Sequence, residues 1–214
     1  MRYDPAVVKK ESEAAIAALG GRVNEYLPWI DPAETKPRGS LEVANRALIL
    51  GALVHISFEA PIGVIRSWLE THELVGLLSE QEAKVVLADM EPDATTKQRL
   101  RWNIEPLWAA AWAGGFADDL GPSTPIGGQL ATILPDLRIN ESPDRFVSSF
   151  HLRSAEQLLA KLDLLYRAHW AARDSRLTGA ADCPFNEGIV HERRRLLEWS
   201  LNAAAHWDDV DMST

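Results

Sequence analysis

The chain has 214 residues, of which 46% are hydrophobic and 25% are charged, values typical of one globular domain rather than a disordered chain. Its formal net charge of −9 disfavours nucleic acids and anionic membrane surfaces as partners, because both require a basic face. The single cysteine, Cys183, excludes an internal disulfide framework and a cysteine-rich zinc site. We therefore expect no metal and no cofactor.

The sequence shows neither an N-terminal secretory signal nor a segment that could cross a membrane. Residues 1–13 are charged and lack the apolar core of a secretory signal. The longest apolar runs, residues 47–54 and 106–117, are far shorter than the roughly 20 residues that cross a bilayer. These features predict a cytoplasmic protein with no membrane partner.

The first element predicted along the chain is a short N-terminal helix. The Asp4–Pro5 pair is a start signal, and the Gly20–Gly21 pair is a stop signal. Residues 22–39 contain three prolines, which predict an irregular connection. We therefore expect an N-terminal helix and connecting arm over residues 1–39 and a main helical domain over residues 40–214.

Further helix signals recur through the main domain. The predicted starts are Ser40, Pro61, Ser79 with Glu82, Asp93 or Thr95, Ser154 with Gln157, and Asn186. Pro106 lies within an apolar stripe and predicts a kink or a break there. Residues 120–143, rich in proline and glycine, leave room for one short helix around residues 129–134.

The last two predicted helices are the clearest. The long one runs from Ser154 to Gly179, and the final one runs from Asn186 to a point near Trp207. No alternation of apolar and polar residues predicts a β-strand. The sequence therefore predicts an all-α, single-domain helical bundle or irregular helical array of about seven to nine helices.

Three side chains that can carry positive charge fall on the apolar faces of these last two helices. At about 100° per residue, His169 and Arg173 lie within the stripe of the long helix, and Arg193 lies within that of the final helix. Because a buried lone charge is costly, each needs a carboxylate, a backbone carbonyl or a cavity holding water or an anion. Candidate carboxylates are Glu105, Glu192, Glu198 and Asp208.

Three interpretations of these charges stay open. They form a structural network that docks the two helices, or they line an anion-binding pocket with His169 titrating near neutral pH, or they reach solvent. His169 is the one catalytic candidate. The candidate binding residues are Arg173, Arg193, Glu105 and Asp163, of which Asp163 is predicted to pair with Arg167 on the opposite, more polar face.

Short motifs typical of enzymes are missing from the sequence. It has no GxGxxG, phosphate-binding P-loop, HExxH, GxSxG or calcium loop. We therefore lean away from an enzyme, although histidine or carboxylate chemistry can be assembled from residues that are scattered in sequence.

Several stretches are similar to a known family. Residues 162–174 (LDLLYRAHWAARD), 192–199 (ERRRLLEW) with 207–210 (WDDV), and 105–114 (EPLWAAAWAG) resemble segments of the domain-of-unknown-function 4272 (DUF4272) family. The likeness extends from about Leu41 to the C-terminus and leaves the first helix outside. The resemblance implies a helical, cytoplasmic bacterial protein with no established reaction.

Two functional hypotheses follow. The first is a non-enzymatic protein that binds or regulates a protein partner, with toxin neutralisation as one conceivable role; the acidic charge, the missing motifs and the 8 tryptophans favour it. The alternative is a small-molecule enzyme or ligand-binding protein with an Arg/His anion pocket between the last two helices. A homodimer formed through a tryptophan-bearing helix is also open.

Overall fold

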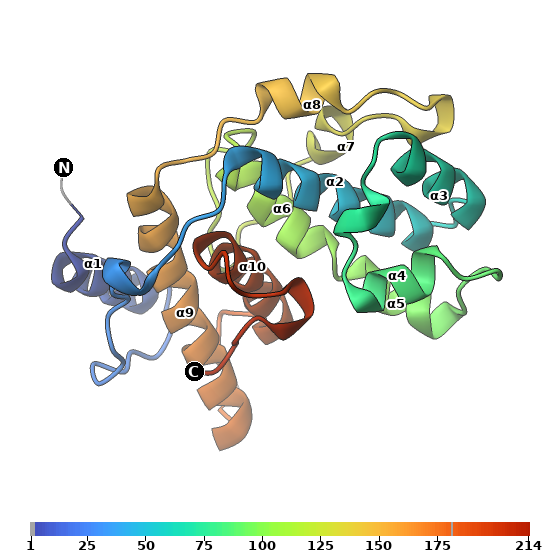
Figure 1. Cartoon of the computed structure of the whole chain (residues 1–214). Coiled ribbons are helices and arrows are strands. Elements are labelled where there is room, and N and C mark those ends of the chain that lie inside the picture. The colour runs from blue at the N-terminus through green and yellow to red at the C-terminus, as the bar shows by residue number, and fades with distance from the viewer. Residues whose placement is uncertain (1–2, 181) are drawn as a thin grey trace.

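A computed structural model describes residues 3–180 and 182–214 and places helices along all of this length (Figure 1). The α-helices are α1 (Pro5–Ala18), α2 (Ser40–Ser57), α3 (Ile62–Thr71), α4 (Glu80–Val86), α5 (Ala94–Arg101), α6 (Ile104–Ala113), α7 (Leu130–Ile133), α8 (Asp144–Ser149), α9 (Ala155–Thr178) and α10 (Glu187–Leu201). Four short 3₁₀ turns are η1 (Pro32–Glu34), η2 (Val75–Leu77), η3 (Leu137–Ile139) and η4 (Trp207–Asp209). The predicted all-α class is confirmed, with nine α-helices of six or more residues beside the four-residue α7 in the described part of the chain.

The helices begin at the capping residues that the sequence predicts. The side chains of Asp4, Ser79, Asp93, Ser154 and Asn186 each accept a hydrogen bond from a backbone N–H in the first turn that follows. These N–H groups have no partner inside their own helix, so each cap satisfies a group that would otherwise need water. The predicted short helix near residues 129–134 is α7.

Pro106 divides its apolar stripe as expected. α5 ends at Arg101 and α6 begins at Ile104, so Pro106 lies in the first turn of α6. A proline is tolerated there because the N–H that it lacks has no acceptor within the helix. The stripe is therefore divided between two helices rather than bent within one.

The predicted end of the final helix near Trp207 was wrong. α10 ends at Leu201, and an isolated parallel β-bridge joins Asn202 to Lys36 in the arm. Lys36 N donates to Leu201 O at 2.8 Å, and Ala203 N donates to Lys36 O at 2.8 Å. The arm therefore takes up backbone groups that would otherwise continue the helix.

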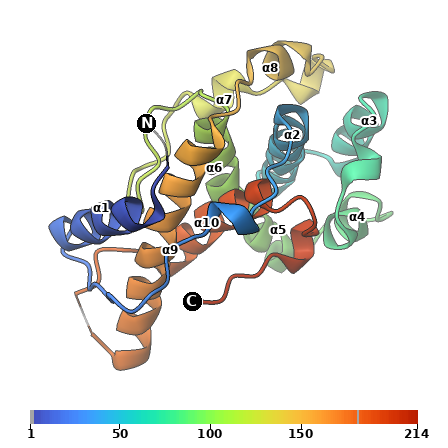
Figure 2. The same ribbon diagram turned by 60° about the vertical axis from the view of Figure 1, so that its left-hand side comes forward.

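α2 and α6 form the centre of the array. Nine of the ten residues of α6 are buried, and α6 packs against both α2 and α10. α10 also packs along α9, whose other side is covered by α1 (Figures 1 and 2). The last turn of α9 projects beyond this core, so Leu177 is 68% exposed although it lies on the apolar stripe of that helix.

Gly114, which ends α6, gives the first stability prediction. A Cβ added to Gly114 would lie 2.4 Å from a ring carbon of Phe150, which is buried against Phe116 and Phe146. We expect Gly114→Ala to lower the free energy of unfolding by about 1–3 kcal/mol, because the ring has to move. Urea denaturation measures this cost. The control is Gly128→Ala, whose added methyl would meet no described atom within 4 Å; an equal cost there would contradict the steric explanation.

Candidate functional site

Arg193 and Glu105, two of the predicted binding residues, form a buried ion pair between α10 and α6. Arg193 Nε donates to Glu105 Oε2 at 2.8 Å, and Arg193 Nη1 donates to Gly121 O at 2.6 Å. Arg193 is only 1% exposed. The guanidinium therefore joins two helices and a loop, as the structural-network interpretation requires.

His169 is also buried, and its partner is another arginine. Arg194 Nη1 lies 3.0 Å from His169 Nδ1. Because a guanidinium only donates, Nδ1 must be the acceptor. Burial, followed by the positive charges of Arg194 and His191, lowers the pKa of His169 to about 4. The anion-pocket interpretation requires His169 to titrate near neutral pH, and this lowered pKa counts against that interpretation because the site favours the neutral ring.

This environment predicts a pH-dependent stability. The unfolded chain protonates His169 near its ordinary pKa of 6.5, whereas the folded chain does so only near 4, so stability falls as the pH drops between these values. We expect a loss of up to about 3 kcal/mol over that range. Denaturation of the native protein and of His169→Asn at a series of pH values isolates this contribution. The pKa of His55 is also lowered by burial, but its contribution is the same in both proteins and cancels in the comparison. Parallel pH profiles of the two proteins would contradict the expectation.

Asp163 lies in a second buried ion pair, on the face of α9 that was predicted to be polar. Arg167 donates to both Asp163 oxygens, at 2.8 and 2.9 Å, and to Pro28 O at 3.0 Å. It also lies 3.4 Å from Glu13 of α1. The predicted Asp163–Arg167 pair is confirmed. Its expected exposure to water was wrong, because α1 and the arm cover this face.

Arg173 was predicted to be buried but is exposed. It was placed on the apolar stripe of α9, but its side chain contacts Thr214 Oγ1 at 3.4 Å. The candidate binding residues are thus spread over three places: a buried α6–α10 pair, the α1 side of α9, and the surface. They do not form one pocket.

Two buried arginines were missed by the sequence analysis. Arg194 donates to Glu198 Oε1 at 2.9 Å and to the backbone oxygens of Met212 and Ser213, so it fastens the C-terminal segment to α10. Arg46 donates to both oxygens of Glu82, at 2.7 and 2.9 Å. The available signal for Arg46 was its position as the one charged residue in the apolar run from residue 43 to 54.

Arginine and tryptophan side chains alternate where the C-terminal segment meets α2. The guanidinium of Arg38 lies 4.0 Å from the Trp199 ring, and those of Arg46 and Arg195 lie 4.9 and 4.3 Å from the Trp207 ring. The two indole rings meet edge to face at 5.7 Å. We call these five residues the Arg–Trp ladder. Cation–π contacts that exclude water contribute about 1–2 kcal/mol each, so the ladder holds the segment in place.

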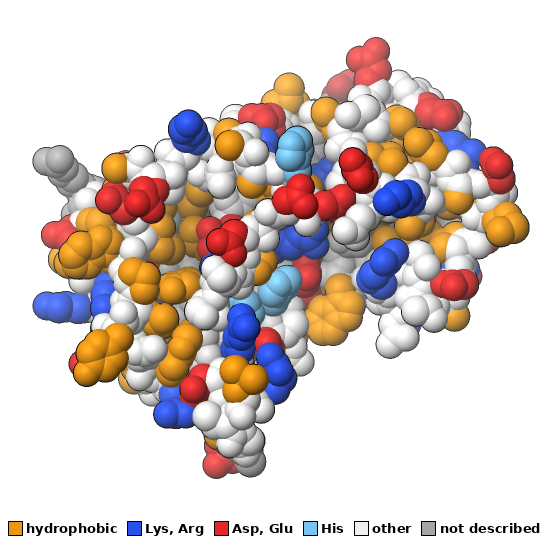
Figure 3. All heavy atoms as spheres, turned by 60° about the horizontal axis from the view of Figure 1, so that its bottom comes forward, with side chains coloured by type: hydrophobic (Ala, Val, Ile, Leu, Met, Phe, Trp, Pro, Cys, Tyr) orange, Lys and Arg blue, Asp and Glu red, His pale blue; other side chains and the backbone are white. Residues whose placement is uncertain are grey.

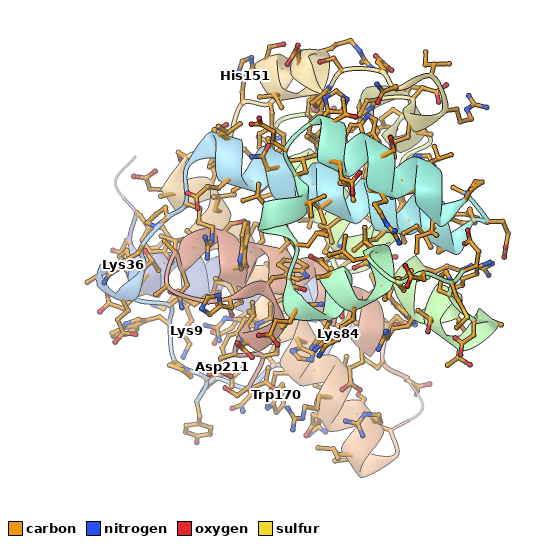
Figure 4. The ribbon with its side chains drawn as sticks, turned by 45° about the vertical axis from the view of Figure 1, so that its right-hand side comes forward. Lys9, Lys36, Lys84, His151, Trp170 and Asp211 are labelled. Atoms are coloured by element: carbon orange, nitrogen blue, oxygen red, sulfur yellow. The ribbon has the colours of Figure 1, made fainter. Side chains whose placement is uncertain are left out.

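An open cleft of about 790 Å³ lies over the Arg–Trp ladder. Its walls are the first half of α2, the η2–α4 segment, and residues 205–209 after α10. Lys84 lines it from α4 (Figure 4). The volume is within the range of about 300–1,000 Å³ that is common for binding sites. We call this hollow the ladder cleft; neither His169 nor Arg193 lines it.

The described residues bear on two other kinds of site. Within residues 3–180 and 182–214, His, Cys, Asp and Glu side chains do not gather in threes as a metal ion would require. Over the same residues, each helix is too short or too polar to cross a membrane.

The fold and the cleft define an all-helical protein whose buried arginines, within the described residues, are paired and whose ladder cleft has a floor of arginine and tryptophan. The model of the family described as "Domain of unknown function (DUF4272)" matches residues 8–210, and the chain belongs to this family. The match includes most of α1, which the resemblance in sequence had left outside. Searches of curated proteins and of solved structures found no match.

Proposed function

We propose that the protein is a non-catalytic binding protein and that a segment of a partner protein docks in the ladder cleft. The observation that carries this proposal is the contrast between the interior charges and the cleft. Arg193, Arg167 and Arg194 are occupied by carboxylates and backbone oxygens. The cleft, by contrast, has side chains that are free to contact a partner.

These free groups are both polar and apolar. The side chains of Asn45, Gln81 and Lys84 line the cleft and make no hydrogen bond within the described residues. Leu41 and Leu77 stand at its edge and are 59% and 49% exposed. A mixture of apolar contacts with polar groups around them is the usual anatomy of a protein interface.

The alternative, an anion pocket between α9 and α10, has less support. An anion would have to displace Glu105 from Arg193, which leaves a buried carboxylate without its partner. His169 is held neutral by burial and by Arg194, so it is a poor proton donor at neutral pH.

Site-specific photo-crosslinking tests the proposal. A photoreactive amino acid replaces Leu77 at the edge of the cleft and, as a control, Leu177 at the projecting end of α9, which is also exposed. We expect irradiation in cells to join a defined protein to position 77 and not to position 177. The same products from both positions, or none from position 77, would contradict the proposal.

A further inference from the structure

We infer that the partner segment that enters the ladder cleft is cationic and apolar, an inference that rests on the function proposed above. The inference depends on which charged side chains of the cleft are already neutralised by partners within the protein. Arg38 Nη1 donates to Glu42 at 3.1 Å, and Arg46 pairs with Glu82. These two arginines therefore contribute little positive charge to an incoming ligand.

The arginines also have few donors left for an anion. Arg38 donates through Nε to Trp199 O at 2.9 Å and through Nη2 to Ala205 O at 2.6 Å. Arg46 donates through Nη2 to Leu77 O at 2.8 Å. Because a bidentate anion site needs two free N–H groups side by side, an acidic segment would have to break existing hydrogen bonds.

The remaining charges around the cleft are mostly negative. Glu80 and Asp209 are exposed at the cleft, and Asp208 uses one oxygen to accept from Gln81 N at 3.1 Å. Lys84 opposes these three carboxylates. Acidic and basic side chains are intermixed over the face shown in Figure 3. Carboxylates at an interface edge attract cationic partners and reject acidic ones.

The tryptophans do not provide a second cation site. Arg46 and Arg195 already contact the Trp207 ring, and Arg38 covers Trp199. Recognition of positive charge therefore depends on the three carboxylates. Leu41, Leu77 and Leu78 line the cleft with accessible apolar surface and are suited to aliphatic side chains. The segment that fits combines Lys or Arg with aliphatic residues.

Short synthetic peptides with the full-length protein test this inference. The probes are two fluorescein-labelled peptides of equal length, one alternating Lys with Leu and the other alternating Glu with Leu. Their binding is measured by fluorescence anisotropy at physiological salt. We expect the Lys–Leu peptide to bind at least about tenfold more tightly than the Glu–Leu peptide. Glu80→Gln/Asp209→Asn should weaken binding of the Lys–Leu peptide by about tenfold.

A matched control separates the cleft from the overall acidity of the chain. Asp144→Asn/Glu156→Gln removes the same two charges from residues that do not line the cleft, and it should leave binding unchanged. Equal weakening by both pairs, equal binding of the two peptides, or no binding of the Lys–Leu peptide would overturn the inference.

The identity of the product crosslinked to position 77 distinguishes failure of this inference from failure of the proposed function. A crosslinked partner segment that is cationic and apolar supports both. An acidic segment, or a second copy of this chain, would overturn the inference while the protein remains a binding protein. No crosslink at all would overturn both.

Discussion

Arg193→Met is expected to lower the free energy of unfolding by about 3–5 kcal/mol. The substitution leaves Glu105 and Gly121 O without their partner in the interior of the protein. A buried carboxylate that loses its counterion either bears the cost of burial or takes up a proton, and both are unfavourable at neutral pH. Urea denaturation followed by circular dichroism measures the loss.

The double variant Glu105→Leu/Arg193→Met is the control. It removes both charges and fills the space with apolar side chains, so we expect it to regain more than half of the lost stability. A cost below about 1 kcal/mol for the single variant would be typical of an exposed ion pair, and would show that the pair does not hold α10 to α6.

Arg167→Met has the second large expected effect, also about 3–5 kcal/mol. This arginine joins α9 to the arm through Pro28 O and lies beside Glu13 of α1, while Asp163 holds its guanidinium in place. We therefore expect the amides of α1 to exchange with deuterium faster in the variant, because α1 loses an attachment to α9.

Arg22→Met provides the comparison. Arg22 also joins the arm to α9, through Asp174, but its side chain is 58% exposed. An exposed pair contributes about 0–1 kcal/mol, so this variant should be close to the unaltered protein in stability. Equal losses from Arg22→Met and Arg167→Met would contradict the view that burial makes the Asp163–Arg167 pair important.

The sequence predicted the ends of helices better than the pairing between them. Caps such as Ser154 and stops such as Gly179 depend on residues within one turn, so local chemistry is sufficient. Asn202 is a different case. Its backbone pairs with Lys36, far away along the chain, and no local pattern near Trp207 indicates that contact.

Periodicity predicted the burial of His169 on α9 and Arg193 on α10 correctly, but it did not predict the burial of Asp163, Arg167 and Arg194. A single apolar stripe describes a helix with one covered face, and His169 and Arg193 lie on such stripes. α9 is covered by α10 on one side and by α1 on the other, so Asp163 and Arg167 are buried although they lie off the stripe. A polar face that another element covers resembles a solvated face in sequence.

The ladder cleft could not be predicted from the sequence for a related reason. Arg38 and Trp199 are 161 positions apart, and their contact exists only because the arm crosses the end of α10. Eight tryptophans are unusual for a chain of this length, but composition does not say which of them form a core and which form the floor of a cleft.

In our proposal, the buried charges stabilise the fold while the ladder cleft binds the partner. The most direct test is the crosslink yield from position 77 in the Glu105→Leu/Arg193→Met variant. We expect the folded double variant to give the same product in the same yield as the protein with its native Glu105 and Arg193, because neither residue lines the ladder cleft. A folded double variant that no longer forms this product would show that the buried charges take part in binding, and would contradict a purely structural role for Glu105 and Arg193.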